Sequence, residues 1–424
     1  MAQLTDDCFA FSGPLMPIEE MEALIAARIG PVVEIERVTL RDASMRVTAA
    51  DVKAPVDLPP FDNSAVDGYA VRHADLRPDG ESRLKISGRL TAGKSADAAL
   101  GASEAVRIFT GAPMPRGADT VFMQEDVESD GDSVILPRGL KCGANRRLAG
   151  EDLRAGSVAI AAGTVLDARY IALAAALGIT EFHVRRRLKV AIFSTGDEVV
   201  EPGSKRGNAA IYDANRYLLF ELLTRRGAIV TDLGILADKP DELARALQAA
   251  AAHHDLIITS GGVSTGEADY VRDAVERIGK LVFWRVAIKP GRPVAMAVIR
   301  GKDASNGAAF VGLPGNPVAV FVTFVRVVRP LLRRLAGARP QELVALPVRA
   351  AFAYSKKKGR REYVRVALRR AADNEIEAVK HPQDGAGIIT SLTETDGLLE
   401  FPEDVTEIAP GARIGFLSYA QLMG

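Results

Sequence analysis

The segment STGDE (194–198) follows directly after an apolar run and carries groups that bind both anions and cations. Ser194, Thr195 and Gly196 offer hydroxyls and closely approachable backbone N–H groups to an anion, whereas the two acids after them could hold Mg²⁺. An ordinary helix N-cap with acids in its first turn has the same composition. Taken alone, the segment supports the two interpretations equally.

A second polar segment, TSGGVSTGEADY (259–270), again follows an apolar run. The adjacent Gly261 and Gly262 let backbone amides approach a ligand, and Ser260 and Ser264 add hydroxyls, as a phosphate or a pterin tail requires. The segment lacks both the Gly-Lys-Ser/Thr ending of a Walker A loop and the G-x-G-x-x-G spacing. NAD or ATP bound in those two modes is therefore disfavoured.

The loop LPGNPVA (313–319) places Pro314, Gly315 and Asn316 ahead of a predicted helix. Its two prolines restrict the unfolded chain, so the loop holds its backbone donors at a low cost in conformational entropy. A plain turn of the same stiffness explains this composition equally well. The loop supports a ligand site only in combination with the other segments.

Two cations, Lys289 and Arg292, flank Pro290 and Gly291 in the segment AIKPGRPVAMAV (287–298). Paired cations at the end of a strand, opposite Gly-rich loops, are suited to holding an oxyanion by charge-assisted hydrogen bonds. A solvated pair of charges is the simpler explanation for this segment when it is considered alone.

These segments lie in a stretch, 188–336, where short β-branched strands alternate with helices. Such alternation is typical of a doubly wound parallel sheet covered on both faces, which binds ligands at the carboxyl ends of its strands. We predict strands at 188–194, 228–234, 255–260, 281–288, 294–299 and 309–313. We predict helices at 213–227, 238–251 (opened by Asp238), 269–279 and 317–336.

The rest of the chain has a different pattern of apolar and polar residues. Residues 15–29 have helical spacing, 61–145 alternate apolar runs with Gly, Pro and Asp, and 167–178 read as a helix capped by Asp167. From about residue 341, strand-length segments are separated by polar turns, which predicts a small β domain.

Composition limits the class of protein. The chain has 424 residues, 48% of them apolar, which suffices for two to four domains with real cores. Lys plus Arg and Asp plus Glu number 54 each, so no global field recruits nucleic acid or an anionic membrane. Two cysteines and no His/Cys cluster exclude a disulfide framework and a zinc site. We expect a cytoplasmic protein without a signal peptide or a membrane span.

Seven motifs follow one another along the chain: FDNSAVDGYAVR (61–72), RIFTGAPMPRGADTV (107–121), GED (150–152), STGDE (194–198), TSGGVSTGEADYV (259–271), IKPGRP (288–293) and LPGNPVA (313–319). In these motifs and in their order, the chain resembles, over essentially its whole length, the molybdopterin molybdenumtransferases, which include bacterial MoeA and the E domain of gephyrin.

The resemblance implies a multidomain α/β plus β fold and an elongated homodimer. It predicts a MogA-like, doubly wound, molybdopterin-binding module at 188–336 and a C-terminal small β domain at 341–424. An N-terminal linker region, 1–55 with 150–187, should surround an inserted β-rich domain at 56–149.

The resemblance also implies a reaction in which adenylylated molybdopterin and molybdate react with the help of Mg²⁺, AMP leaves and molybdenum cofactor forms. The acids expected to bind Mg²⁺ and act in catalysis are Asp67, Glu198, Asp238 and Asp269. Lys289, Arg292, Arg360, Arg361 and Ser391 are the candidates to hold molybdate. The remaining expected substrate-binding residues are Thr110, Ser194, Thr195, Gly196, Ser260, Gly261, Gly262, Ser264, Gly291, Pro314, Gly315 and Asn316.

One departure from the family concerns Ala319, where many relatives carry Ser, and it bears on oxyanion affinity. Two other functions stay open at this point. A molybdopterin adenylyltransferase would resemble residues 188–336 alone, and a non-catalytic cofactor-binding scaffold would have the same binding segments. The resemblance further suggests molybdopterin adenylyltransferase and molybdoenzyme maturation proteins as partners.

Overall fold

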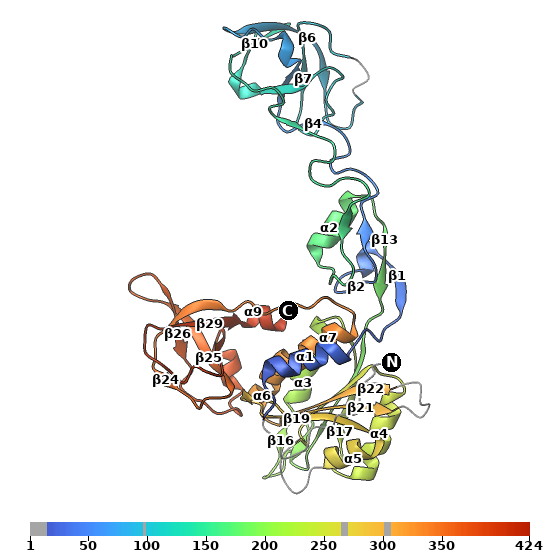
Figure 1. Ribbon diagram of the computed structural model, residues 1–424, viewed down its shortest axis with the longest axis vertical. Coiled ribbons are helices and arrows are strands. Elements are labelled where there is room, and N and C mark those ends of the chain that lie inside the picture. The colour runs from blue at the N-terminus through green and yellow to red at the C-terminus, as the bar shows by residue number, and fades with distance from the viewer. Residues whose placement is uncertain (1–14, 96–98, 264–269, 301–306) are drawn as a thin grey trace.

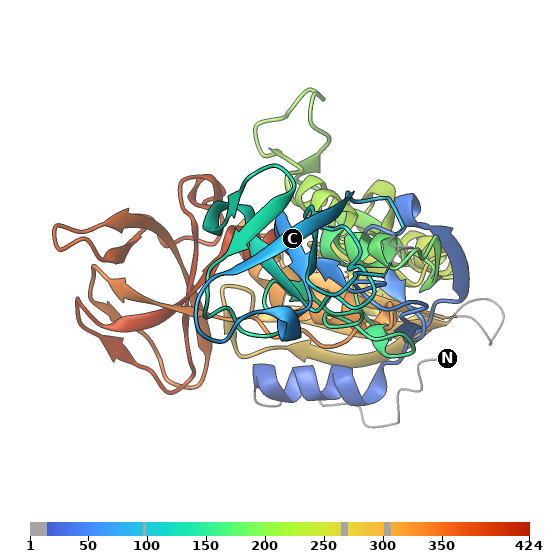
Figure 2. The same cartoon turned by 90° about the horizontal axis from the view of Figure 1, so that it is seen from above.

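The structure is a computed structural model that describes residues 15–95, 99–263, 270–300 and 307–424. The molecule is elongated (Figure 1): a β-rich unit lies at one end of the long axis and an α/β module at the other. A middle segment with α2 (Ala168–Ala176) and β13 (Glu181–Arg185) connects them, and a C-terminal β unit lies beside the module in both views (Figures 1 and 2).

The central sheet of the α/β module has the strand order β17-β14-β18-β22-β21-β19. Helices cover both faces, because the central strands β14, β18 and β22 are buried along nearly their whole length and leave two faces to cover. The strands are β14 (Lys189–Thr195), β17 (Ile229–Leu236), β18 (Leu256–Ser260), β19 (Gly279–Arg285), β21 (Pro293–Arg300) and β22 (Gly307–Leu313). The helices are α3 (Asn215–Arg225), α4 (Pro240–Ala251), α5 (Tyr270–Ile278), α6 (Pro317–Thr323) and α7 (Arg329–Leu335), and a small pair, β15 (Val199–Val200) with β16 (Ile211–Tyr212), lies outside the sheet.

The prediction of a fully parallel sheet is wrong at one strand, β21, which runs against the others. β14 is parallel to β17 and β18, and β18 is parallel to β22, but β21 is antiparallel to both β22 and β19. Only residues 301–306 separate β21 from β22. A parallel connection needs a crossover of a dozen or more residues, so this short segment permits only antiparallel pairing.

The predicted helix 317–336 is interrupted. A π-helical segment, η4 (Phe324–Val328), separates α6 from α7, and Pro330 stands at the start of α7. Proline lacks the N–H of a regular helix and its ring collides with the carbonyl four residues earlier, so a wider local turn is the expected accommodation.

The middle segment combines residues from both sides of the β-rich unit in sequence. It holds α1 (Ile18–Arg28), which packs on the α/β module, and a sheet of β1 (Ile35–Thr39), β13 (Glu181–Arg185) and β2 (Val47–Thr48). β3 (Val52–Lys53) pairs with β12 (Val158–Ile160). The prediction that Asp167 caps α2 (Ala168–Ala176) is confirmed, since its side chain accepts a hydrogen bond from the Arg169 N–H.

The β-rich unit is a six-stranded sheet in the order β8-β5-β7-β6-β10-β9, with β4 (Asn63–Ser64) and β11 (Arg146–Arg147) paired at its base. Its strands are β5 (Gly68–Val71), β6 (Ser82–Leu90), β7 (Glu104–Ile108), β8 (Thr120–Met123), β9 (Glu128–Ser129) and β10 (Ser133–Leu136). We retain the predicted boundaries at 56 and 149 as our proposal for this domain.

The C-terminal unit is a closed barrel. Its strands follow the order β25-β26-β23-β29-β27, and β27 pairs back onto β25. The elements are β23 (Leu346–Ala350), β24 (Tyr354–Ser355), β25 (Arg361–Arg370), β26 (Ile376–Lys380), α8 (Thr390–Thr393), β27 (Gly397–Phe401), β28 (Glu407–Ile408), β29 (Arg413–Ser418) and α9 (Tyr419–Met423). β20 (Ile288–Lys289), which belongs to the α/β module in sequence, pairs with β25 and joins the two units.

None of the helices in the described ranges is both long enough and apolar enough to cross a membrane.

Candidate functional site

The carboxyl ends of β14, β18 and β22 bring three predicted segments to one edge of the sheet. Asn215, at the start of α3, holds two of them together, because its Nδ2 donates to Ser260 Oγ (2.8 Å) and to the Gly315 carbonyl (2.7 Å). The Ser260 hydroxyl donates in turn to the Pro314 carbonyl (3.2 Å). Sequence reasoning missed Asn215, because an Asn at a helix start has an ordinary explanation in helix capping.

Ser194 Oγ and Asn215 Oδ1 are among the buried polar atoms near this edge that have no hydrogen-bond partner in the described residues. An unpaired buried polar group costs about 1–3 kcal/mol, so native structures rarely leave one without a partner. The two atoms are therefore available to a ligand or to water at the strand ends.

Gly261 and Gly262 have positive φ values of 91° and 67°. A Cβ added to Gly262 would lie 2.4 Å from Val271 Cγ2 and 2.8 Å from Thr195 Cγ2. Gly262 is therefore required by the packing of the module itself. Because a substitution there would disturb the fold directly, it would not test whether a ligand approaches this glycine.

Two of the predicted metal-binding acids lie at neighbouring strand ends. Asp238 follows β17 and accepts a hydrogen bond from the Thr195 hydroxyl at the end of β14. It does not open α4 as predicted, because Lys239 is the residue at the N-cap position and makes no side-chain cap. Glu198 is exposed on the loop after β14.

Asp67 lies in the β-rich unit, far along the molecule from α4, α5 and β16 (Figure 1). Its carboxylate accepts hydrogen bonds from the Thr110 N–H and hydroxyl, both at 2.7 Å. These two bonds, first the backbone one, lower the pKa of Asp67 and keep it ionised. Within one chain, Asp67 is therefore far from Glu198 and Asp238.

Within the described ranges, no three His, Cys, Asp or Glu side chains converge in a way that could hold a metal ion. The predicted Ser264 and Asp269 lie outside the described residues. The carboxylates that the structure does place are therefore too few in one chain to form a complete cation site.

A cavity of about 300 Å³ lies between the α/β module and the C-terminal barrel. β20 creates it, because its pairing with β25 sets Lys289 opposite Glu362. The cavity wall includes Lys289, Gly291, Pro314, Asn316 and Ala319 from the module, and Tyr354, Glu362, Arg365 and His381 from the barrel.

Glu362 organises the cations around this cavity. Its side chain is only 1% exposed and accepts hydrogen bonds from Lys289 Nζ (3.1 Å), the Tyr354 hydroxyl (2.8 Å) and Arg360 Nε (2.7 Å). Burial opposes ionisation of Glu362, but the bonds from Tyr354 and Lys289 outweigh it and lower the pKa. A permanent buried anion thus orients Lys289, whose own side chain is 47% exposed and free to contact a ligand.

A second cation of the cavity wall, Arg365, was missed by sequence reasoning. It is buried, its Nε donates to Ser391 Oγ (3.0 Å), and its Nη2 donates to the Gln383 and Gly385 carbonyls. The available signal was a lone arginine inside an otherwise apolar strand, YVRVAL. Because the Ser391 hydroxyl also donates to the Ile388 carbonyl, both its hydrogen-bonding roles are used inside the protein.

Two predicted oxyanion ligands do not reach the cavity. Arg292 is exposed and does not line it, whereas Arg361 forms ion pairs with Glu19, Glu400 and Glu403 and lines a different cavity. The structure therefore assembles Lys289 and Arg365, with Arg360 held nearby by Glu362.

Comparison with known proteins places these features in one family. Residues 16–178 match the MoeA N-terminal region (domain I and II), 191–334 match a probable molybdopterin binding domain, and 347–419 match the MoeA C-terminal region (domain IV). The molybdopterin molybdenumtransferase of Haemophilus influenzae is 36% identical, over 92% of this chain and 95% of its own.

One more relative and one solved structure are also similar to this chain over most of its length. The molybdopterin molybdenumtransferase of Nostoc sp. is also 36% identical, over 89% of this chain and 87% of its own. The crystal structure of the molybdopterin biosynthesis moeA protein from Pyrococcus horikoshii OT3 is 28% identical, with a TM-score of 0.78 over 96% of this chain and all of that one.

Proposed function

Because this chain belongs to the molybdopterin molybdenumtransferases, transferases that insert molybdenum during molybdenum cofactor biosynthesis, we propose that it acts on adenylylated molybdopterin and molybdate with Mg²⁺ and releases AMP. The observation that carries the proposal is the cavity with Lys289 and Arg365 in its wall, next to the Ser260 and Gly315 edge of the sheet. An oxyanion pocket beside backbone and hydroxyl donors suits two anionic substrates that must react with each other.

The two parts of the site have separate roles in this proposal. Lys289 and Arg365 attract molybdate, a tetrahedral dianion, because cations in a partly dry pocket form strong charge-assisted hydrogen bonds. Ser194, Ser260 and Asn215 lie at the strand ends, where doubly wound sheets hold phosphate-bearing ligands. Ala319 contributes no hydroxyl to the cavity, so Lys289 and Arg365 carry the oxyanion interaction.

Glu198 and Asp238 fit a magnesium ion that is shared with the substrate. Mg²⁺ prefers oxygen ligands, keeps several waters and is often held by only one or two carboxylates plus substrate phosphates. When bound, it would neutralise charge that develops on the phosphoanhydride as AMP leaves. In this proposal Glu198 and Asp238 supply its protein ligands from the α/β module.

Asp67 completes the site from a second copy of the chain. In one chain it lies far from Glu198, while its pKa, lowered by Thr110, keeps it ready to act as an anion. A two-fold axis between two elongated subunits builds two identical composite sites. We therefore propose a homodimer in which each α/β module receives Asp67 from its partner.

The function is tested by incubating the purified protein with adenylylated molybdopterin. We expect AMP release that requires both molybdate and Mg²⁺ and needs no ATP. A protein that instead consumes ATP and unmodified molybdopterin would be an adenylyltransferase. Tight pterin binding without AMP release under any of these conditions would make it a scaffold, and either result would overturn the proposal.

Ser391 is expected to position Arg365 rather than to contact molybdate. Ser391→Ala removes one neutral partner of the guanidinium, worth about 1 kcal/mol, so the molybdate concentration for half-maximal activity should rise roughly fivefold. Thr390→Ala, at the exposed neighbouring position, should leave it unchanged. Steady-state AMP release at varied molybdate measures both. An equal response of the two variants would contradict the positioning role.

A further inference from the structure

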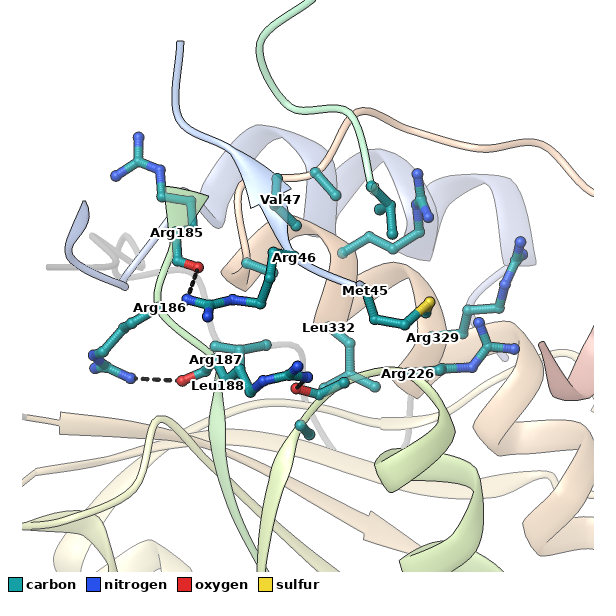
Figure 3. Close-up of a pocket in the computed structure, with 16 residues that line it drawn as sticks. Met45, Arg46, Val47, Arg185, Arg186, Arg187, Leu188, Arg226, Arg329 and Leu332 are labelled. Carbon is teal, nitrogen blue, oxygen red and sulfur yellow. Dashed lines mark hydrogen bonds between the residues drawn. The ribbon is translucent and has the colours of Figure 1, made fainter. Parts of the chain in front are cut away.

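A second charged pocket lies at the opposite end of the central sheet (Figure 3). Leu188 and Ala228, which directly precede β14 and β17, line it, whereas the site above lies where those strands end. The middle segment contributes Met45 to Val47, and α7 closes the pocket from the other side. The pocket is thus a separate place, at the junction between the middle segment and the α/β module.

The charge of this pocket is one-sided. Seven of the sixteen residues that line the pocket are arginines, and none of the sixteen is Asp or Glu. Buried or half-buried arginines normally face a carboxylate, because an unpaired charge in a low-dielectric site is costly. The arginines of this pocket therefore need a negatively charged partner that the residues lining it do not supply.

Three of the arginines use groups outside the pocket. Arg46 pairs with Glu36, and Arg186 pairs with Glu34 and Asp255. Arg185 donates to the Val33 carbonyl. The charge of Arg46 and Arg186 is thereby partly neutralised.

The other four arginines have no carboxylate partner in the described part of the chain, and they donate their hydrogen bonds to neutral oxygens. Arg187 donates to the Gly227 carbonyl (Figure 3) and Arg226 to the Leu422 carbonyl, while Arg329 bonds to the Gln341 amide and Arg333 to the Arg339 carbonyl. In addition, the Nε atoms of Arg226 and Arg329 are buried without a partner among the described residues.

The pKa shifts of two of these four arginines agree with this geometry. Burial, and then the positive charges of neighbouring arginines, lower the pKa of both Arg226 and Arg329 to about 10. For Arg226 the neighbours are Arg329 and Arg333, so the members of the cluster destabilise one another's charge. An anion between them would remove this repulsion.

We propose that this pocket binds a tetrahedral divalent oxyanion, the chemistry shared by inorganic phosphate, sulfate and molybdate. Its volume of about 70 Å³ exceeds the roughly 10–15 Å³ that one water needs, so the pocket has room for a single small oxyanion. Planar guanidinium groups bind such oxygens in pairs of parallel hydrogen bonds. The bound anion would join the middle segment, which leads to the β-rich unit, to the α/β module.

Binding is tested by calorimetric titration with inorganic phosphate, sulfate or molybdate at constant ionic strength. The Lys289→Gln background weakens any binding at the cavity beside the barrel. We expect saturable binding of at least one of the three anions, and Arg226→Gln should weaken it at least tenfold. Arg225→Gln is the matched control, since Arg225 is the last residue of α3, directly before Arg226, but lies exposed in a pair with Glu221, and it should leave affinity within twofold.

Thermal unfolding supplies a readout that is independent of binding heat. Without oxyanion, Arg226→Gln and Arg329→Gln should each raise the unfolding temperature, because they relieve repulsion, and each should lose the rise that phosphate produces in the parent. Three results would each overturn the proposal: no binding of any of the three anions, the same stabilisation by potassium chloride at equal ionic strength, or equal affinities for Arg226→Gln and Arg225→Gln. A change in oligomeric mass with unchanged anion affinity in Arg226→Gln would also overturn it, since carboxylates of a second copy would then be the counterions.

Discussion

Asp67→Asn and Glu198→Gln are each expected to inactivate the homodimer, and a mixed dimer with one substitution per subunit is expected to regain activity. Under our proposal each site combines Asp67 of one subunit with Glu198 of the other. One site of the mixed dimer then carries both defects and the other carries neither. By two-fold symmetry, activity should return to at most about half that of the unmodified dimer.

Folding should survive both substitutions. Asn at position 67 keeps an oxygen that can accept from the Thr110 N–H and hydroxyl, and Glu198 is exposed. Asp62→Asn is a matched control in the same segment, because Asp62 is a half-buried acid, as Asp67 is, and accepts from the Ala149 N–H, and it should retain most activity. AMP release by differently tagged, co-purified subunits measures the outcome. If subunits demonstrably exchange and no activity returns, each site is built within one chain.

Lys289→Gln is expected to raise the molybdate concentration for half-maximal activity while pterin binding stays nearly unchanged. The substitution removes one charge-assisted hydrogen bond worth about 1.5–3 kcal/mol, which corresponds to roughly a ten- to 150-fold rise. Glu362 keeps its bonds from Tyr354 and Arg360, so the local structure should persist. AMP release at varied molybdate, together with pterin titration, separates the two effects.

The control for Lys289 comes from the same motif. The sequence suggested that Lys289 and Arg292 act together, but Arg292 is exposed outside the cavity wall, so Arg292→Gln should change the molybdate requirement by less than twofold. A molybdate dependence that is unaffected by Lys289→Gln would remove Lys289 from the oxyanion site. An equal rise in the molybdate requirement of both variants would show that Lys289 and Arg292 act together.

Local patterns in the sequence were sufficient to predict most elements of the α/β module and the segments at its carboxyl edge. β14, α3 and β18 lie within two residues of their predicted bounds, because period, Gly stops and strand composition are properties of a few neighbouring residues. The motifs of 194–198, 259–270 and 313–319 could be placed together for the same reason, since parallel strands end at one edge.

Contacts between distant residues were decided only by the tertiary structure. Glu362 and Lys289 are 73 positions apart and meet because β20 pairs with β25, and this pairing selects Lys289 over Arg292. Arg361 and Arg365 lie on one strand, yet Arg361 joins Glu19 from α1 while Arg365 enters the cavity wall.

The same limit applies to the charged pocket at the other end of the sheet. RRRLK (185–189) is a basic run in the sequence, and nothing local shows that Arg187 meets Arg226 and Arg329 around one cavity. The sequence by itself determined which elements form and which residue types end their strands. Only the fold decided which charges share a low-dielectric space, because that depends on packing between residues far apart in the chain.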